Sequence, residues 1–302
     1  MDLSFERIEA AVGRIPATFQ RTPQLLDERL SEMAGREVVV KVETLNPIGS
    51  FKGRGTWLLA EKLDPAQTWV CSTAGNFGQG VAYAARARGA SVQVFVEADV
   101  PEQKVERMRS LGANVELAED SAAAALKFTD ASGDRVLVKD GLDPAIAEGA
   151  GTIGLELSDA GPIDTALVQV GDGALITGVA RAIKETSPGT RVVGVCARGA
   201  PAMAHSFEAR HPVSAEASTI ATALSITDPI PESVARMTEL VDEIVLVDED
   251  ELRSAMRLVA ETMGLLVEPA GAAGVAALRQ GEVTARGEGR IAVLLTGAGY
   301  PG

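Results

Sequence analysis

The stretch Asn46-Pro47-Ile48-Gly49-Ser50-Phe51-Lys52-Gly53-Arg54-Gly55 places a lysine between a predicted strand at residues 38–42 and a predicted helix. A lysine in this position can be a solvated surface residue. It can also be a nucleophilic amine, held near a helix N-terminus and partly desolvated so that it can be neutral. Helix N-termini also attract phosphate groups. The spacing alone favours the surface residue, so the rest of the chain has to decide.

Short apolar, β-branched runs alternate with Ala-rich helical segments on both sides of this stretch. Continuous apolar strands separated by helices are typical of parallel sheets buried on both faces. Right-handed crossovers would then place the loops after the strands at one sheet edge, where ligands usually bind. We predict strands at residues 38–42, 68–72, 92–96, 115–117, 135–138, 165–170, 192–195 and 290–295, and helices at 81–88, 102–111 and 176–185.

The composition narrows the class of protein. The chain has 302 residues, which is enough for one large α/β domain or two modest domains sharing a core. Its net charge of −14 disfavours nucleic acids and anionic membranes as partners. Two isolated cysteines, Cys71 and Cys196, form no disulfide framework, and the N-terminus does not resemble a signal peptide. We therefore expect a cytoplasmic protein.

Further motifs lie where predicted strands give way to loops. Residues 72–77 form a strand-to-helix turn with an Asn, and residues 171–175 form a glycine-containing loop that could cradle phosphate with backbone N–H groups. Thr296 follows the last predicted strand, and Glu268 could be simply a helix N-terminal carboxylate. Each motif alone is a modest signal, but their common placement at strand ends is specific.

Together the motifs resemble the fold-type II pyridoxal-phosphate enzymes, which include threonine and serine dehydratases, serine racemase, threonine synthase and cysteine synthase. Ser50–Gly55 resembles the lysine motif of that family, and Arg21-Thr22-Pro23 and Lys41-Val42-Glu43 match its opening. The resemblance covers about residues 18–300. It implies the two-domain, tryptophan synthase β-like α/β fold, with parallel sheets and flanking helices. Residues 1–65 and 143–302 would form a large cofactor-binding domain, and residues 66–142 a small mobile domain.

The resemblance also implies roles for individual residues. Lys52 would carry pyridoxal 5′-phosphate as a Schiff base and act as the catalytic base. Asn76 would bind the ring hydroxyl of the cofactor, and Thr296 would bind its pyridine nitrogen, an arrangement that favours β-elimination or β-replacement over transamination. The remaining cofactor contacts would be Phe51, Glu268 and the phosphate loop Gly171, Asp172, Gly173, Ala174 and Leu175. The substrate carboxylate would bind Ser72, Thr73, Ala74, Gly75, Asn76 and Phe77.

Several positions depart from the family pattern and bear on the reaction. Gly53 is unusual after the lysine, and Phe77 stands where dehydratases and racemases often have His. Ala74 stands where serine racemases have a second catalytic serine, so racemisation is disfavoured. Asp172 is an awkward neighbour for a phosphate, so we expect its side chain to point away or to accept hydrogen bonds from the loop.

Two further departures concern the substrate and metal ions. Thr222-Ala223 replaces an Asp-Gly pair that faces the substrate in dehydratases. Cys196 stands where the dehydratase–racemase branch often has a Glu that binds a divalent cation, so we predict no metal there. The exact amino-acid substrate is left open by these changes.

The resemblance implies a lyase of amino-acid metabolism. We expect β-elimination of a β-hydroxy amino acid such as L-threonine or L-serine to a 2-keto acid and ammonia, and we expect a homodimer. One alternative is γ- or β-replacement, as in threonine synthase or cysteine synthase. The other is a catalytically retired protein that binds the cofactor and acts as a sensor or partner.

Overall fold

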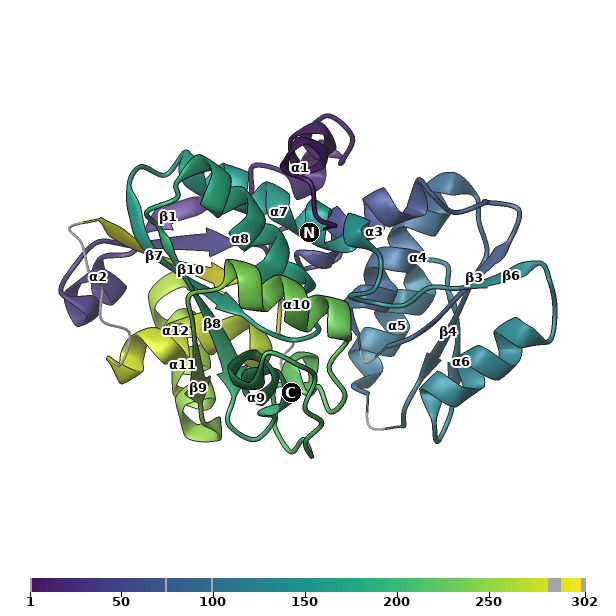
Figure 1. The fold of residues 1–302 in the computed structure, drawn as a ribbon. Coiled ribbons are helices and arrows are strands. Elements are labelled where there is room, and N and C mark those ends of the chain that lie inside the picture. The colour runs from purple at the N-terminus through teal and green to yellow at the C-terminus, as the bar shows by residue number, and fades with distance from the viewer. Residues whose placement is uncertain (1, 74, 99, 282–288, 300–302) are drawn as a thin grey trace.

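The computed structural model describes residues 2–73, 75–98, 100–281 and 289–299, and it contains two separate sheets. Figure 1 shows the two sheets side by side, each with its own helices. The smaller sheet is built from residues 68–137, and the larger one from segments on both sides of that range. The chain therefore leaves the larger sheet, completes the smaller one and returns.

The larger sheet has six strands and is parallel except at one edge. Its strand at that edge, β1, pairs antiparallel with β2, and every other neighbouring pair in the sheet is parallel. The central strands are almost wholly buried, as expected for strands covered by helices on both faces. In spatial order the strands are β1 (Gln24–Leu26), β2 (Val38–Val42), β10 (Arg290–Leu295), β7 (Ile163–Gln169), β8 (Arg191–Ala197) and β9 (Glu243–Val247).

The smaller sheet has four strands, and all of its neighbouring pairs are parallel. Its core is formed by alternating inward residues such as Trp69, Cys71 and Val94, which are fully buried. In spatial order the strands are β5 (Asn114–Leu117), β4 (Val92–Val96), β3 (Thr68–Ser72) and β6 (Arg135–Leu137). All eight strands predicted from the sequence are present. The pattern missed β9 and the three-residue β1, whose two leucines are half-exposed and carry no burial periodicity.

Several of the helices begin at a Ser or Asp whose side chain accepts a hydrogen bond from an N–H of the first turn. Asp143 accepts a hydrogen bond from the N–H of Ala145 ahead of a proline, and Asp248 forms a capping box with Glu251. No helix in the described ranges is both long and apolar enough to cross a bilayer. The α-helices are α1 (Phe5–Val12), α2 (Glu28–Ala34), α3 (Lys52–Ala60), α4 (Asn76–Arg88), α5 (Glu102–Ser110), α6 (Ser121–Asp130), α7 (Pro144–Ser158), α8 (Ala174–Thr186), α9 (Ala202–Ala209), α10 (Pro231–Leu240), α11 (Glu249–Met263) and α12 (Pro269–Gln280), and the 3-10 helices are η1 (Ala17–Phe19) and η2 (Thr222–Leu224).

Glycines allow three helices to pack at backbone distance. A Cβ atom at Gly178 of α8 would lie 1.8 Å from the carbonyl oxygen of Ala147 in α7, and one at Gly55 of α3 would lie 2.4 Å from that of Ile146. No side chain fits in such a gap. The helix that begins with Lys52 is therefore held closely against α7, and α7 in turn against α8.

A cluster of buried charged side chains connects α3 to its neighbours. The Arg54 guanidinium is fully buried, with Nη2 2.8 Å from Glu43 Oε1 and Nη1 2.6 Å from Glu156 Oε1. Lys41, also fully buried, donates to Glu156 Oε2 at 2.5 Å. Two cations and two carboxylates balance one another, as buried charges must. The cluster ties the helix of Lys52 to β2 and α7.

The unusual Gly53 has a steric cause. A Cβ atom at this position would lie 2.2 Å from Cε1 of Phe19, whose ring is fully buried beneath α3. The ring also packs edge-on against Tyr83 of α4, with ring centroids 5.1 Å apart. The glycine thus makes room for an aromatic side chain from the N-terminal segment.

Candidate active site

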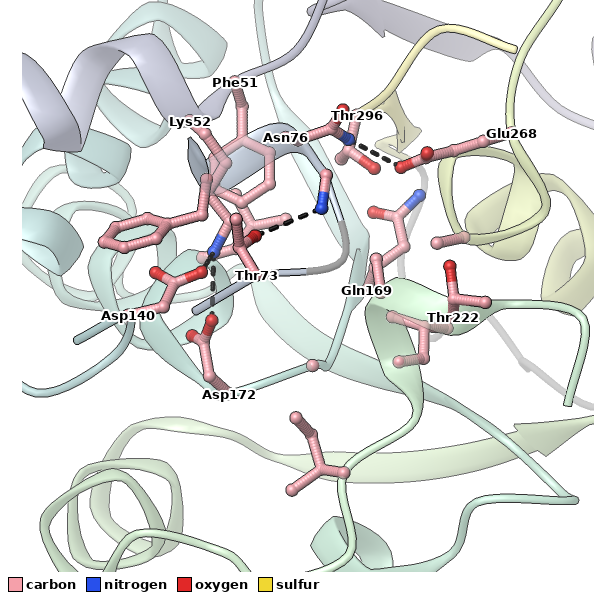
Figure 2. A pocket seen from close by; sticks show the side chains of 18 of the residues that line it. Phe51, Lys52, Thr73, Asn76, Asp140, Gln169, Asp172, Thr222, Glu268 and Thr296 are labelled. Carbon is pink, nitrogen blue, oxygen red and sulfur yellow. Dashed lines mark hydrogen bonds and ion pairs between the residues drawn. The ribbon is translucent and has the colours of Figure 1, made fainter. Parts of the chain in front are cut away.

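A cavity of about 330 Å³ lies where the loops of the two sheets meet. Its volume is in the range of small-molecule and cofactor sites. Figure 2 shows Lys52 on one side of it, and Asn76, Thr296 and Glu268 on another. The lining residues come from the ends of strands and the starts of helices, as expected for a site at the carboxyl edge of parallel sheets.

Twelve of the residues assigned to the cofactor and substrate from the sequence line this cavity, as do Thr222 and Ala223. The twelve are Phe51, Lys52, Ser72, Thr73, Gly75, Asn76, Phe77, Gly171, Asp172, Leu175, Glu268 and Thr296. Gly173 and Ala174 lie at the start of α8 and do not line the cavity. Ala74, assigned to the substrate loop, lies outside the described residues.

Lys52 begins α3, and its amine is held between two carboxylates. The Nζ atom lies 2.5 Å from Asp140 Oδ2 and 2.9 Å from Asp172 Oδ2. Burial lowers the pKa of Lys52, but the charges of Asp140 and Asp172 outweigh it and raise the pKa above its ordinary value. The free amine is therefore held as an ammonium between these two carboxylates, of which the sequence analysis had singled out only Asp172.

Asp140 and Asp172 respond differently to the same surroundings. Burial, and next the charge of Asp172, raise the pKa of Asp140 to about 7 against the opposing effect of Lys52. Burial also raises the pKa of Asp172, but Lys52 and the N–H of Ala174 outweigh it and lower the pKa. Asp140 is thus the member of the pair that holds a proton more readily.

The Asp172 side chain meets the second of the two expected alternatives, a hydrogen bond from the loop. Its Oδ1 accepts a hydrogen bond from the N–H of Ala174 at 2.7 Å, so it does bind within the loop. Its Oδ2, however, faces Lys52 rather than pointing away from the cavity (Figure 2). Ahead of α8, Gly173 has φ +94°, a conformation that favours glycine. The first N–H groups of α8 have no partner within the helix and can receive an anion.

Asn76 begins α4 and forms a chain of polar contacts with two other residues. Its Nδ2 donates to Glu268 Oε1 at 2.8 Å, and Lys104 Nζ donates to Glu268 Oε2, also at 2.8 Å. Glu268 stands at the N-terminal boundary of α12, yet its side chain caps no N–H of that helix. The interpretation of Glu268 as only a helix-terminal carboxylate therefore does not describe it, since the side chain reaches into the cavity.

Two aromatic rings lie near Lys52, and hydroxyl groups of the loop after β3 line the same cavity. The Nζ atom lies 5.1 Å from the ring centroid of Phe51 and 5.9 Å from that of Phe77. On the loop after β3, the N–H of Gly75 donates to Thr73 Oγ1 at 3.1 Å, and Ser72 shares a 2.7 Å hydrogen bond with Ser121. Phe77 is buried, so this side of the cavity is apolar.

Gln169 ends β7 and presents an unsatisfied oxygen at the cavity. Its Nε2 donates to the carbonyl oxygens of Gly271 and Leu294, while its buried Oε1 has no hydrogen-bond partner among the described residues. Figure 2 places the side chain on the same side of the cavity as Thr296 and Glu268. An unpaired buried acceptor at a cavity wall is a feature that a bound ligand can satisfy.

The sequence motifs did not identify several lining residues. Lys104, Asp140, Gln169 and Asp228 are the polar ones among them. Asp140 lies three residues beyond the end of β6, so its place near a strand end was a usable signal, whereas Lys104 lies in a charged helix and looks solvated. The remaining additions are apolar: Leu224, Ile226, Ile230 and Ala270.

Cys196 lies inside β8 and is buried, and burial raises its pKa to about 12. Within the residues that the structure covers, no group of three or more His, Cys, Asp or Glu side chains could hold a metal ion.

Comparison with known proteins yields consistent matches. Residues 15–297 match the family described as pyridoxal-phosphate dependent enzyme. The chain is similar to L-threonine ammonia-lyase of Geobacter sulfurreducens, with 34% identity over 93% of this chain and 72% of that protein. The fold is similar to the T.th. threonine deaminase (32% identity, 99% of both chains, TM-score 0.91) and to maize serine racemase (27% identity, 100% and 95% of the two chains, TM-score 0.93).

Proposed function

The chain belongs to the pyridoxal-phosphate dependent enzyme family, and on that basis we propose that it is an ammonia-lyase acting on a β-hydroxy amino acid such as L-threonine or L-serine. The products are a 2-keto acid and ammonia. The observation that carries the proposal is the position of Lys52 in one cavity with Asn76, Thr296 and the Gly171–Leu175 loop.

The cavity fits pyridoxal 5′-phosphate in shape and in donor chemistry. A Cβ atom at Gly297 would lie 2.3 Å from Glu268 Oε1, and one at Gly171 would lie 2.4 Å from the carbonyl oxygen of Ala223. Glycine at these two positions therefore lets Glu268 and the backbone of Ala223, both of which line the cavity, approach closely. The unpaired Gln169 Oε1 adds an acceptor at the wall beside Thr296.

Each part of the cofactor has candidate partners among the described residues. Lys52 would hold it covalently through its amine, and the N–H groups at the start of α8 would bind the phosphate. Thr296 would bind the ring nitrogen and Asn76 the ring hydroxyl, with Phe51 beside the ring. Asp172 already binds one N–H of the loop through Oδ1, which leaves the other N–H groups for the phosphate.

When bound, pyridoxal 5′-phosphate supplies an electron sink for the pair of electrons left at Cα after deprotonation. The amine of Lys52 removes that α-proton as a general base. The N–H groups and hydroxyls of residues 72–77 bind the substrate carboxylate at the N-terminus of α4. Position 74 carries only a methyl group, so it cannot deliver a proton to the opposite face, and elimination is favoured over racemisation.

The direct test is product formation by the holoenzyme from L-threonine, L-serine and bulkier β-hydroxy amino acids. We expect 2-oxobutyrate from L-threonine, pyruvate from L-serine and ammonia from both. Replacing Lys52 by Ala should lower turnover at least about a hundredfold, because it removes the general base. Lys62→Ala is the matched control, since that lysine is half-exposed and pairs with Asp143.

Other outcomes would identify the alternatives. Release of phosphate from O-phosphohomoserine, or uptake of an external thiol, would show a replacement enzyme. A bound-cofactor absorbance that no amino acid perturbs would show a catalytically retired protein. Formation of D-serine from L-serine, with no keto acid, would show a racemase.

We also propose the arrangement around the site. Residues 66–142 act as a small domain that closes over the substrate, which the separate four-stranded sheet supports.

We further propose a cytoplasmic homodimer. The two buried thiols are compatible with a reducing compartment, and the half-exposed Leu25 and Leu26 on the edge strand β1 are candidates for a subunit contact. Light scattering at several concentrations would test the dimer.

A further inference from the structure

Two carboxylates meet one amine at the point where the reaction takes place. Asp140 comes from the loop after β6, and Asp172 from the loop between β7 and α8. Both contact Lys52 Nζ, and the amine and both carboxylates line the cavity. The Lys52 ammonium compensates only one negative charge, so the pair has a surplus carboxylate even in this state.

The excess of negative charge at this site grows when Lys52 loses its positive charge. A lysine that holds a cofactor covalently, or that is free to accept an α-proton, is no longer an ammonium between the two carboxylates. Two adjacent buried carboxylates cannot both stay ionised without a cation, so they share a proton. Because the Lys52 ammonium opposes protonation of Asp140, its loss favours the protonated form further.

The hydrogen bonds decide which carboxylate takes that proton. Asp172 Oδ1 accepts from the N–H of Ala174, a contact that stabilises the ionised form. Asp140 Oδ1 accepts a longer bond, 3.1 Å, from the N–H of Gly141, and Oδ2 faces Lys52. Cys71 is another titratable group near Asp140, and its thiol is buried; burial, and next the Asp140 charge, raise its pKa to about 12, so it stays neutral.

We propose that Asp140, held beside Asp172, donates the proton that the departing β-hydroxyl needs. This inference rests on the proposed function, since it concerns the leaving group of the same reaction. Hydroxide is a poor leaving group, and a positioned acid assists its departure. The base Lys52 acts at Cα, and the β-oxygen is only two bonds away. A carboxyl group 2.5 Å from the base nitrogen lies within reach of that oxygen.

The proton count closes. Lys52 Nζ takes the proton from Cα, and Asp140 gives its proton to the β-oxygen. The Cβ–O bond breaks with its electron pair on oxygen, and water leaves. When Lys52 is again bound covalently to the cofactor it is no longer a free ammonium, and the proton that it gives up passes to Asp140, its hydrogen-bond partner, so both residues are restored for the next cycle. Asp172 is a positioning residue in this scheme, because it keeps the proton on Asp140 without touching the leaving group.

Two substrates that differ only in the leaving group test the proposal. L-Serine must lose a hydroxyl, which needs an acid, whereas β-chloro-L-alanine loses chloride, which does not. Both give pyruvate. In the holoenzyme of Asp140→Asn we expect turnover of L-serine to fall at least about a hundredfold and that of β-chloro-L-alanine to change less than about threefold. Retained chloride elimination also shows that the variant is folded.

A matched control separates acid catalysis from loss of a negative charge. Asp228 lines the same cavity, but it is exposed and bonded to Ser214 and Thr227 rather than to Lys52. Asp228→Asn should affect the two substrates alike. If Asp140→Asn also affects them alike, or leaves the L-serine rate unchanged, Asp140 is not the acid.

Infrared spectroscopy tests whether Asp140 carries a proton. The infrared spectrum of the wild-type holoenzyme at pH 7 should contain the carbonyl band of a protonated carboxylic acid, and Asp140→Asn should lack it. Absence of that band from the wild type would overturn the proposal. If the wild type eliminates chloride but forms no keto acid from any β-hydroxy amino acid, the proposed function fails and the acid role falls with it. If it dehydrates L-serine equally well without Asp140, only the acid role fails.

Discussion

Lys104 and Glu268 form an ion pair between helices that belong to different sheets, with Nζ 2.8 Å from Oε2 and only about a tenth of each side chain exposed. Lys104 lies on α5 beside the smaller sheet, and Glu268 precedes α12 beside the larger one. Because Glu268 also binds Asn76, the pair fixes the start of α4 relative to the larger sheet.

We therefore expect Lys104→Met to raise KM for the amino acid more than it lowers kcat, because it loosens the substrate loop without removing the base. It should also lower the free energy of unfolding by about 3 kcal/mol, as it leaves a buried carboxylate without its cation. Steady-state kinetics and urea unfolding measure the two effects. In the double variant with Glu268→Gln, part of the lost stability should return; full additivity would show that the pair is not coupled.

Arg54→Met should be strongly destabilising. The change leaves Glu43 and Glu156 buried with one cation, Lys41, in place of two, and loss of one partner from a buried ion cluster costs about 3 to 5 kcal/mol. Urea unfolding of the apoprotein measures it. Arg14→Met serves as the control, because its half-exposed pair with Glu61 should contribute less than about 1 kcal/mol. Equal losses for the two variants would contradict the view that burial makes Arg54 important.

Gly178→Ala should lower stability by about 1 to 3 kcal/mol or more, because the added methyl overlaps the carbonyl of Ala147 and forces α7 and α8 apart. The thermal midpoint and the urea midpoint should both fall. Gly189→Ala adds the same methyl where no atom lies within 4 Å, so it should change stability by less than about 0.5 kcal/mol. If Gly178→Ala leaves the free energy of unfolding unchanged, the two helices can separate without loss of stability.

Replacing Asp140 by Asn should change the pH dependence of stability of the apoprotein in a defined direction. The folded-state pKa of Asp140, about 7, exceeds the unfolded value of about 3.9, so the folded state binds the proton more tightly. The stability that this group contributes is complete below about pH 4 and is lost as the pH rises to about 7. Asp172 has a lowered pKa, so its contribution is lost only as the pH falls, which is outside this window.

The wild type should therefore lose stability relative to Asp140→Asn between about pH 4 and pH 7. Urea unfolding at half-unit intervals would show the difference, with the exposed Asp130→Asn as a control for net charge. A constant difference across that range would mean that Asp140 is ionised throughout it.

Sequence reasoning found the residues that stand in local motifs and missed those that only the topology brings near. Lys52, Asn76 and Thr296 each lie at a strand-to-loop junction within a distinctive motif, so their convergence followed from the parallel-sheet pattern. Asp140 lies in Lys139-Asp140-Gly141, which resembles an ordinary turn. Its place near a strand end is one signal, but its contact with Lys52 becomes visible only once β6 is placed next to β3, because that pairing brings the loop to Lys52.

The sequence analysis missed Lys104 and Gln169 for a similar reason. Lys104 lies among charged residues on α5 and gives no sign that it is buried against the opposite sheet. Gln169 ends an apolar strand, and its unpaired oxygen depends on which backbone carbonyls lie beside its amide. Local pattern predicts elements and junctions, whereas contacts between residues more than a hundred positions apart need the assembled fold.

The contact between Gly53 and Phe19 has a consequence for how this chain can vary. The two positions lie in different segments, yet a side chain at one occupies the volume of the ring at the other. A substitution at either alone leaves an overlap or a hole directly under the catalytic helix. We expect relatives that carry a larger residue after the lysine to carry a smaller one at the position of Phe19. The two sites should therefore be exchanged together when a segment is grafted between such proteins.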